Sequence, residues 1–560
     1  GKKKTPQNPQ NPQHPLPQGL VALGYDLVST GGSAAALSAA GLPVSTVESL
    51  TGFPEMLSGR VKTLHPGVHG GILAIRSDAS HLKAVADAGI SLIDVVAVNL
   101  YPFRATVTNE ERPPTFDEAV ENIDIGGPAM LRSAAKNHAA VTVAVDPADY
   151  PEILSRLSSS SEASSSSSGS PPGGGGGEAF RARLAWKAFS HTGSYDAQVA
   201  EWMWNAVGDR AVDPASGAQR LAPPPEIVVP MRLSSALRYG ENPHQAAAFY
   251  EDLSLAEAAP LGGGGVARSV QHHGKEMSYN NYLDADAAYQ CVTDLAAPAC
   301  VIVKHTNPCG AALAAPGSAD LRPAYRAAVE ADPTSAFGGI VAFNRVVDEE
   351  LAADIREFRS PSDGETRMFY EIVVAPGYTP AGLEKLKGKS KALRILEAPP
   401  RARGKASRSL RQVGGGWLLQ ESDAVCAEDV EFTVVSKAQP TEEMLKDLRF
   451  AWTVAKHVKS NAIAVAKGGE LLGMGSGQPN RVESTRLALG KAGPEAAKGS
   501  AMASDAFFPF SWGDSVEAAC LAGVAAIAHP GGSMRDQDAV DCCDKYGVVL
   551  CTTGVRHFRH

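Results

Sequence analysis

Short apolar runs alternate with helix-like segments along most of the chain. Residues 95–98, 141–145 and 301–303 are apolar and largely β-branched stretches, which is typical of strands covered on both faces. Polar or Gly-containing turns follow such runs, and segments with helical spacing lie between them. This alternation of strand and helix predicts α/β domains with parallel strands.

Breaks in this pattern divide the chain into two main regions. A chain of 560 residues is too long for one core, so several domains are expected. The predicted segments are a disordered tail at 1–18, an α/β domain at 19–211 with a flexible Ser/Gly-rich insertion at 158–177, a linker at 212–229, and a second α/β region at 230–560. Two similar runs of strand, turn and helix, about 230–390 and 430–560, are compatible with an internal duplication.

Composition narrows the classes of partner and compartment. With a formal net charge of -9, the chain is not expected to bind nucleic acid or anionic membranes. No apolar run is long enough to span a bilayer. The 8 Cys lack zinc spacing and are expected to be free thiols in a reducing compartment, and no metal is predicted. Because the chain starts at Gly1 and its N-terminus looks incomplete, the expected location stays undecided between the cytoplasm and a plastid or other organelle.

One strand end carries the most distinctive chemistry. The apolar run at 301–303 leads into Lys304 and His305, and Pro308 and Gly310 are expected to end the strand. Sites in α/β proteins usually lie where strands leave the sheet. A Lys beside a His combines a fixed positive charge with a group that exchanges protons near neutral pH. On local sequence alone, a surface Lys and a hydrogen-bonded structural His are the simpler interpretation.

Two N-terminal segments are rich in phosphate-binding groups. A predicted strand is followed by Thr30-Gly31-Gly32-Ser33 and a helix, an arrangement that directs free N–H groups at an anion. Arg60 and Lys62 would point to one side of an extended segment, and Thr63 adds a hydroxyl. A capped turn and a solvated basic strand are the structural alternatives.

Other segments gather ligand-type side chains in turns. Asp124 and Lys136 are a possible acid–base pair, with an ordinary helix carboxylate and an exposed Lys as the alternative. Residues 237–245 combine an Arg, an aromatic residue, an Asn and a His, and 503–510 form an aromatic loop suited to a flat heterocycle.

These motifs together resemble one known family. In chain order they are STGGS, GFPEMLSGRVKTLHP, NLYPF, IDIGGPAMLRSAAKNH, LRYGENPHQ, VKHTNPCG, DPTSAFGG, ASDAFFPF and PGGSMRDQ. By these motifs the chain is identified as a member of the bifunctional purine-biosynthesis enzymes that join a formyltransferase to an inosine monophosphate (IMP) cyclohydrolase. The resemblance covers roughly 19–157, 178–204 and 230–560.

The resemblance implies two reactions on two folds. A C-terminal pair of cytidine-deaminase-like α/β/α units would transfer a formyl group from the co-substrate 10-formyltetrahydrofolate to the amine of aminoimidazole carboxamide ribonucleotide (AICAR). An N-terminal methylglyoxal-synthase-like parallel α/β domain would close the ring of the formylated product (FAICAR), giving IMP and water. The family is homodimeric, with transferase sites built across the subunit interface.

The resemblance also implies roles for individual residues. His305 would shuttle the proton of the attacking amine, Lys304 would stabilise the oxyanion or protonate the leaving nitrogen, and Lys136 would assist cyclisation. The implied AICAR ligands are Arg238, Tyr239, Asn281, Gly338, Glu371, Asn461, Phe507 and Arg556. The implied folate contacts are Arg481, Val482, Pro509, Asp514, Ser533 and Met534. The implied IMP and FAICAR ligands are Thr30, Gly31, Gly32, Ser33, Arg60, Lys62, Thr63, Tyr101, Asp124 and Gly126.

One segment departs from the family pattern. Family members open with a strand and a Ser-x-Ser-Asp-Lys-Thr-Gly-like loop that also binds the phosphate, whereas residues 2–18 show no strand pattern. The first strand of the N-terminal sheet is therefore expected to be missing, and the cyclohydrolase half to be impaired.

Two alternative functions to weigh are a regulatory nucleotide-binding module and a zinc deaminase. Methylglyoxal-synthase-like domains also act as effector sensors, so the N-terminal domain is alternatively a nucleotide-binding regulatory module beside a formyltransferase. Pro308-Cys309 matches half of a zinc-deaminase motif, but no second Cys and no His-x-Glu partner occur at the required spacing.

Overall fold

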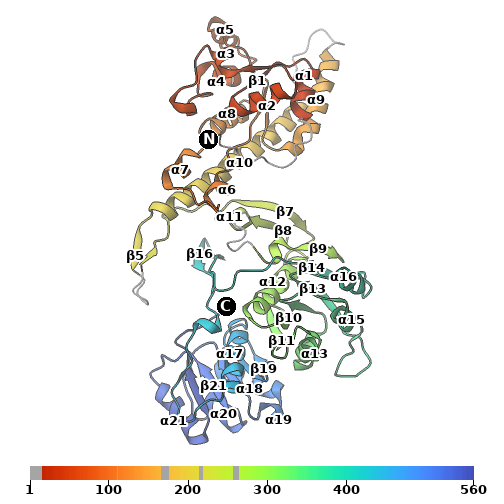
Figure 1. Ribbon diagram of the computed structural model, residues 1–560, viewed down its shortest axis with the longest axis vertical. Coiled ribbons are helices and arrows are strands. Elements are labelled where there is room, and N and C mark those ends of the chain that lie inside the picture. The colour runs from red at the N-terminus through yellow and green to blue at the C-terminus, as the bar shows by residue number, and fades with distance from the viewer. Residues whose placement is uncertain (1–14, 110, 165–175, 213–218, 257–263) are drawn as a thin grey trace. The chain divides into compact units, whose positions relative to one another are not determined.

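The computed structural model describes residues 15–109, 111–164, 176–212, 219–256 and 264–560. The chain forms two compact units, Gly1–Met231 and Arg232–His560, which are called the N-terminal and C-terminal units below. In Figure 1 the N-terminal unit runs from red to yellow and the C-terminal unit from green to blue.

Two parallel strand pairs and their helices build the N-terminal unit. β1 (Leu27–Ser29) pairs with β2 (Val44–Thr46), and β3 (Val95–Ala97) pairs with β4 (Thr142–Ala144), in separate two-stranded sheets. The predicted parallel pairing is present, but the pairs do not join into one sheet. The helices are α1 (Pro15–Ala22), α2 (Gly31–Ala39), α3 (Val47–Thr51), α4 (Pro66–Leu73), α5 (Ala79–Asp87), α6 (Phe103–Val107), α7 (Phe116–Glu121), α8 (Gly126–Lys136), α9 (Tyr150–Ser164) and α10 (Gly176–Val207).

Ordered structure begins before Gly19. α1 starts at Pro15, and its Leu16 side chain is 1% exposed in a core that includes Ile72 and Leu131. The prediction that residues 15–18 belong to a disordered tail is therefore wrong, because burial of Leu16 and Leu20 fixes this turn against the core. Residues 1–14 lie outside the described residues.

The predicted insertion and linker contain regular structure. Residues 158–164 continue α9, and 165–175 lie outside the described residues. In the predicted linker, β5 (Arg210–Val212) and β6 (Gln219–Leu221) form an antiparallel pair, and 213–218 are not described.

A 12-stranded sheet runs through the C-terminal unit in the order β17-β22-β21-β20-β18-β19-β11-β10-β12-β13-β14-β9. Its strands are β9 (Val270–His273), β10 (Ala299–Lys304), β11 (Asn307–Leu313), β12 (Gly339–Phe343), β13 (Tyr370–Ala375), β14 (Arg394–Glu397), β17 (Thr433–Val434), β18 (Ile463–Lys467), β19 (Glu470–Gly475), β20 (Ala501–Ser504), β21 (Ala526–His529) and β22 (Val549–Thr552). Two strand pairs lie outside this sheet: β7 (Met231–Leu237) with β8 (Ala247–Asp252), and β15 (Arg408–Val413) with β16 (Gly416–Glu421).

Helices connect these strands. They are α11 (Leu253–Ala256), α12 (Tyr279–Asp294), α13 (Arg322–Ala331), α14 (Pro333–Ala336), α15 (Glu349–Glu357), α16 (Pro380–Lys387), α17 (Glu442–Lys456), α18 (Arg481–Ala492), α19 (Pro494–Ala497), α20 (Ser515–Leu521) and α21 (Asp536–Tyr546).

The large sheet consists of two halves with the same design. Outward from the central β11–β19 contact, each half has two antiparallel, two parallel and one antiparallel pairing. The chain also visits strands and helices in the same order in both halves. The structure thus shows an internal duplication that the sequence only suggested.

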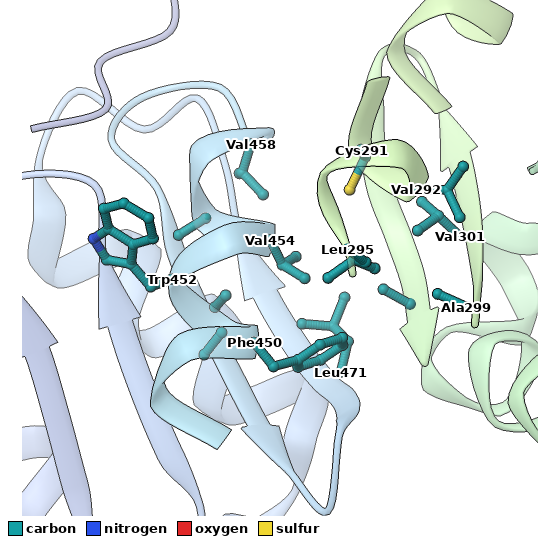
Figure 2. Packing of buried hydrophobic residues seen from close by; sticks show 14 of the residues in the cluster. Cys291, Val292, Leu295, Ala299, Val301, Phe450, Trp452, Val454, Val458 and Leu471 are labelled. Carbon is teal, nitrogen blue, oxygen red and sulfur yellow. The ribbon is translucent and has the colours of Figure 1, made fainter. Parts of the chain in front are cut away.

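One apolar cluster joins the halves. Leu295 follows α12 in the first half, and Val454 and Phe450 lie on α17 in the second; all are at most 6% exposed. Figure 2 shows Leu295 and Val454 facing each other across the seam between the halves, with Leu471 beside them. This shared core holds the functional side chains of both halves in one rigid frame.

Candidate active sites

The Lys304-His305 pair lies at the tip of a β-hairpin. β10 ends at Lys304 and β11 begins at Asn307, so His305 and Thr306 are the two loop residues. Their φ angles are +51° and +61°. Left-handed φ at both positions suits a two-residue hairpin, but Gly or Asn usually occupies them, and a β-branched Thr is disfavoured.

The residues expected to end this strand lie instead in the next one. Pro308 and Gly310 are buried within β11, so the prediction that they stop the strand is wrong. Pro308 lies opposite Val303, at a register shift that follows Ile302. A β-bulge is one of the few places where a strand accepts Pro, which cannot donate a ladder hydrogen bond.

Contacts from three directions hold the hairpin tip. The Thr306 N–H donates to Asp284 Oδ1 at 2.7 Å, and Asn307 Nδ2 donates to the His305 carbonyl at 2.9 Å. Asn307 Oδ1 accepts the Lys459 N–H, from the second half, at 3.0 Å. The His305 side chain itself is exposed, so the tip presents an imidazole on a fixed turn.

Lys304 is directed at the turn before β12. Its Nζ donates to the Phe337 carbonyl at 3.0 Å. A Cβ built on Gly338 would lie 2.9 Å from this Nζ, and the Gly338 φ is +74°. Glycine at 338 therefore provides both the backbone conformation and the space that the ammonium group occupies.

The contact between Asn307 and Lys459 brings the hairpin tip next to Asn461. Asn461 Oδ1 accepts a hydrogen bond from Arg481 Nη2 at 2.7 Å, and its Nδ2 donates to the Gln478 carbonyl at 2.7 Å. Both ends of this amide are therefore fixed, and Asn461 is held rigidly on the side of the site formed by the second half.

Arg481 forms a buried ion pair. Its side chain is 4% exposed and contacts the Asp505 carboxylate, which is 0% exposed, and it also donates to Ser504 Oγ at 2.9 Å. The implied folate contact at Arg481 is thus a side chain whose guanidinium is already occupied, and its visible effect is to orient Asn461.

Three implied AICAR ligands have structural partners of their own. Asn281 Oδ1 accepts the Ser278 N–H at 3.1 Å in the capping box of α12. Glu371 accepts from Arg394 at 2.8 Å, and Arg394 is 8% exposed. The Arg238 guanidinium lies 5.6 Å from the centre of the Tyr239 ring.

The remaining transferase residues are on surface loops and at helix starts. Phe507 and Pro509 are exposed, Met534 is fully exposed, and Val482 is half-buried. Asp514 caps α20 through Ser515, the Ser533 N–H donates to Asp536 at 3.2 Å, and the Arg556 guanidinium stacks 4.4 Å from the Phe558 ring. Within the described part of the chain, no hydrogen bond connects these residues to Lys304 or His305.

Beside the Ser533-Met534 loop, His529 is buried without hydrogen-bond partners. It is 0% exposed, and neither ring nitrogen has a partner among the described residues. Burial lowers the pKa of His529 to about 4, against the smaller opposing effect of Asp536. The ring is thus neutral in the folded state.

His529 is expected to make the fold acid-sensitive. The unfolded ring has a pKa of about 6.5, so between about pH 6.5 and 4 the unfolded chain binds more protons, and stability falls as pH falls. The loss approaches about 3 kcal/mol at the acid end. We expect His529→Phe to flatten the dependence of the unfolding midpoint on pH in this range, relative to exposed His244→Phe. An unchanged slope in His529→Phe would contradict this assignment.

In the N-terminal unit, the implied IMP and FAICAR ligands surround one cavity. The cavity has a volume of about 2840 Å³ and is lined by all of them except Gly31. It also borders β1 and β3, the strands of the two separate sheets. Lys136, at the end of α8, is not among the lining residues.

The two implied cationic ligands of this cavity are paired with carboxylates. Arg60 contacts Glu121, and Lys62 Nζ lies 3.2 Å from Glu55. Both ion pairs are partly exposed, and such pairs contribute little free energy. An incoming phosphate can therefore replace the carboxylate partner of each cation at low cost. Asp124 Oδ1 accepts the Gly127 N–H at 2.9 Å, so this carboxylate caps the start of α8.

Two family models match adjoining parts of the chain. The model described as "AICARFT/IMPCHase bienzyme" matches residues 134–491, and the "MGS-like domain" model matches 14–129. The chain belongs to the AICARFT/IMPCHase bienzyme family. The α/β fold class, with an MGS-like N-terminal domain, is confirmed, and members of this family are bifunctional formyltransferase and IMP cyclohydrolase enzymes.

Relatives in the family match over nearly the whole chain. The bifunctional purine biosynthesis protein PurH of Halalkalibacterium halodurans is 44% identical over 98% of this chain and 97% of its own length. The PurH protein of Desulfitobacterium hafniense is 46% identical over 97% of each chain. Among the described residues, no helix is long and apolar enough to cross a membrane, and no cluster of three or more His, Cys, Asp or Glu is placed to hold a metal ion.

Sequence reasoning missed two structural partners of the site. Asp284 lies within α12, and nothing in its local sequence marks it as the partner of the Thr306 N–H. Asp505 was part of an aromatic loop, although its carboxylate pairs with Arg481. The signal for Asp284 is its position in the structure, because it is the sixth residue of α12 as Asp447 is the sixth residue of α17 in the second half.

Proposed function

We propose that the C-terminal unit transfers the formyl group of 10-formyltetrahydrofolate to the AICAR amine at His305, and that the N-terminal unit closes FAICAR to IMP. The observation that carries the proposal is the exposed His305 imidazole beside Lys304 on a hairpin tip held from three sides. A binding site alone needs no such pairing of an ammonium group and a proton acceptor.

In the proposed formyl transfer, every bond formed is matched by a bond broken, and every proton has an acceptor. The AICAR nitrogen attacks the formyl carbon, and His305 takes the proton that this nitrogen loses. Lys304 stabilises the charge that develops on the formyl oxygen. The bond between carbon and the N10 atom of the folate then breaks, and a proton passes to N10, so tetrahydrofolate leaves. This chemistry uses no metal ion.

The substrates are proposed to meet around the hairpin tip. Asn461, fixed by Arg481, and Gly338, beside Lys304, support an AICAR subsite there. The exposed Phe507, Pro509 and Met534 side chains are suited to flat rings, AICAR at Phe507 and the pterin at the other two. The other assigned ligands are Arg238, Tyr239, Asn281, Glu371 and Arg556 for AICAR, and Arg481, Val482, Asp514 and Ser533 for folate.

A homodimer is part of the proposal. Apolar side chains are strongly exposed on the two strand pairs outside the large sheet: Trp417 is 63%, Leu418 58% and Leu233 53% exposed. Exposed apolar side chains gathered on hairpins favour an interface with another protein surface. A second copy would also supply loops to a transferase site that one chain leaves open.

Separate assays of the two half-reactions test the proposal. With AICAR and 10-formyltetrahydrofolate, we expect tetrahydrofolate to form and FAICAR to accumulate, because β1 and β3, which border the cavity of the cyclisation ligands, lie in separate two-stranded sheets and not in one continuous sheet. Lys136→Ala is expected to leave transfer unchanged and to slow cyclisation of added FAICAR further.

Either assay can contradict the proposal. Absence of tetrahydrofolate formation would refute the transferase assignment. Cyclisation of FAICAR as fast as transfer would refute the expected weakness of the N-terminal site. Slower transfer in Lys136→Ala would refute the division of labour between the units.

A further inference from the structure

The hairpin that carries His305 has a counterpart in the second half of the C-terminal unit. Gly468 and Gly469 occupy the two loop positions between β18 and β19, with φ angles of +63° and +76°. These match the +51° and +61° of His305 and Thr306. Both hairpins also have a register shift near the end of their first strand. The same turn is thus built once with glycines and once with side chains.

Each turn is anchored to an aspartate of the helix before it. Asp447 accepts the Gly468 N–H at 2.9 Å and the Gly469 N–H at 2.8 Å. Asp284 accepts the Thr306 N–H at 2.7 Å. Asp284 is the sixth residue of α12 and Asp447 the sixth residue of α17, so the two carboxylates are equivalent.

The lysine contact is repeated as well. Lys304 Nζ donates to the Phe337 carbonyl at 3.0 Å, and Lys467 Nζ donates to the Lys498 carbonyl at 2.9 Å. A glycine with positive φ follows each of these carbonyls, at +74° for Gly338 and +71° for Gly499. The frame of aspartate, lysine and glycine therefore also exists around a turn, Gly468-Gly469, that carries no imidazole.

The two turns differ in how much they depend on this frame. Glycine adopts left-handed φ readily, so the second turn is stable without help. His305 and Thr306 carry side chains that disfavour this conformation, and Thr306 is β-branched. The hydrogen bond to Asp284 offsets that cost, so its loss is expected to let the first turn relax and the imidazole move.

We propose that Asp284 is a positioning residue for formyl transfer, which holds the His305-Thr306 turn in its left-handed conformation and so fixes the imidazole against the AICAR amine. This inference rests on the proposed function of His305.

The matched pair Asp284→Ala and Asp447→Ala tests this role in the full chain. Asp284→Ala is expected to lower kcat for formyl transfer about tenfold to a hundredfold, with both KM values within about threefold, because a displaced catalytic group costs rate more than binding. Asp447→Ala removes the equivalent anchor from a turn of two glycines, and its kcat is expected to stay within about twofold of the unmodified chain.

A rescue variant separates positioning from general damage. Adding Thr306→Gly to Asp284→Ala is expected to recover at least about threefold in kcat, because glycine holds the left-handed conformation without the anchor. If Asp284→Ala does not fold, Asp284→Asn replaces it; the amide keeps one acceptor oxygen, and kcat is expected to fall by a smaller factor.

Three results would overturn the inference: kcat of the folded Asp284 variant within about twofold of the unmodified chain, an equal loss in Asp447→Ala, or no recovery on adding Thr306→Gly. His305→Ala, assayed in parallel, separates the two levels. If His305→Ala remains active, the proposed function itself fails. If it is inactive while the Asp284 variant is unaffected, only the positioning role fails.

Discussion

His305→Ala is expected to lower the rate of formyl transfer about 10²–10⁴-fold, the range that one general acid–base group contributes. The imidazole is the exposed group at the hairpin tip, and Lys304 cannot replace it, because its ammonium group already donates to the Phe337 carbonyl and has no acceptor atom for the proton. The KM for AICAR is expected to change little, because the nucleotide ligands assigned above are other side chains. Initial rates of tetrahydrofolate formation measure the effect.

The same protein sample contains its own control. Cyclisation of added FAICAR is assigned to the N-terminal unit, so it is expected to proceed in His305→Ala, a change in the C-terminal unit, at the rate of the unmodified chain. Equal losses of both activities would indicate damage to the fold. Unchanged transfer would remove His305 from the mechanism and with it the central assignment.

Arg481→Met is expected to destabilise the C-terminal unit by about 3–5 kcal/mol, the cost of breaking a buried ion pair at one partner. Asp505 is 0% exposed, so its carboxylate would be left without the opposite charge that it contacts. The melting temperature of this unit is expected to fall by roughly 5–10 °C. Calorimetry of the full chain measures it, and kcat is expected to fall too, because Asn461 loses the hydrogen bond at its Oδ1.

Two variants calibrate this measurement. Arg486→Met lies on the same helix, where its side chain is 65% exposed and its partner Glu483 is 3.4 Å away, so a change within about 0.5 kcal/mol is expected. Adding Asp505→Asn to Arg481→Met removes the stranded charge and is expected to restore part of the loss. A melting temperature for Arg481→Met equal to that of Arg486→Met would show that the pair carries no net stability.

The hydrophobic pattern of a short segment predicted its structure correctly where that segment alone determines the structure. The apolar run at 301–303 is a strand covered on both faces, as its pattern predicts. Pro308 was misjudged for a physical reason: proline normally ends a strand, but a register shift in β10 places it at a bulge where its missing N–H is harmless. Leu16 was misjudged because the Gln-, Asn- and Pro-rich residues before it are typical of a disordered tail, whereas its side chain is buried in the core of the N-terminal unit.

By itself, the sequence determined the family and its two reactions, and it proposed the side chains at the sites, because motifs preserve chemistry within short spans. Only the tertiary structure decided which groups hold those side chains. The anchor of His305 is Asp284, twenty-one positions earlier on a helix, and the orientation of Asn461 depends on Arg481 and Asp505. The order of strands in the sheet and the packing of helices bring these partners into contact, because they set the distances between residues far apart in the chain. Local spacing carries no record of those distances.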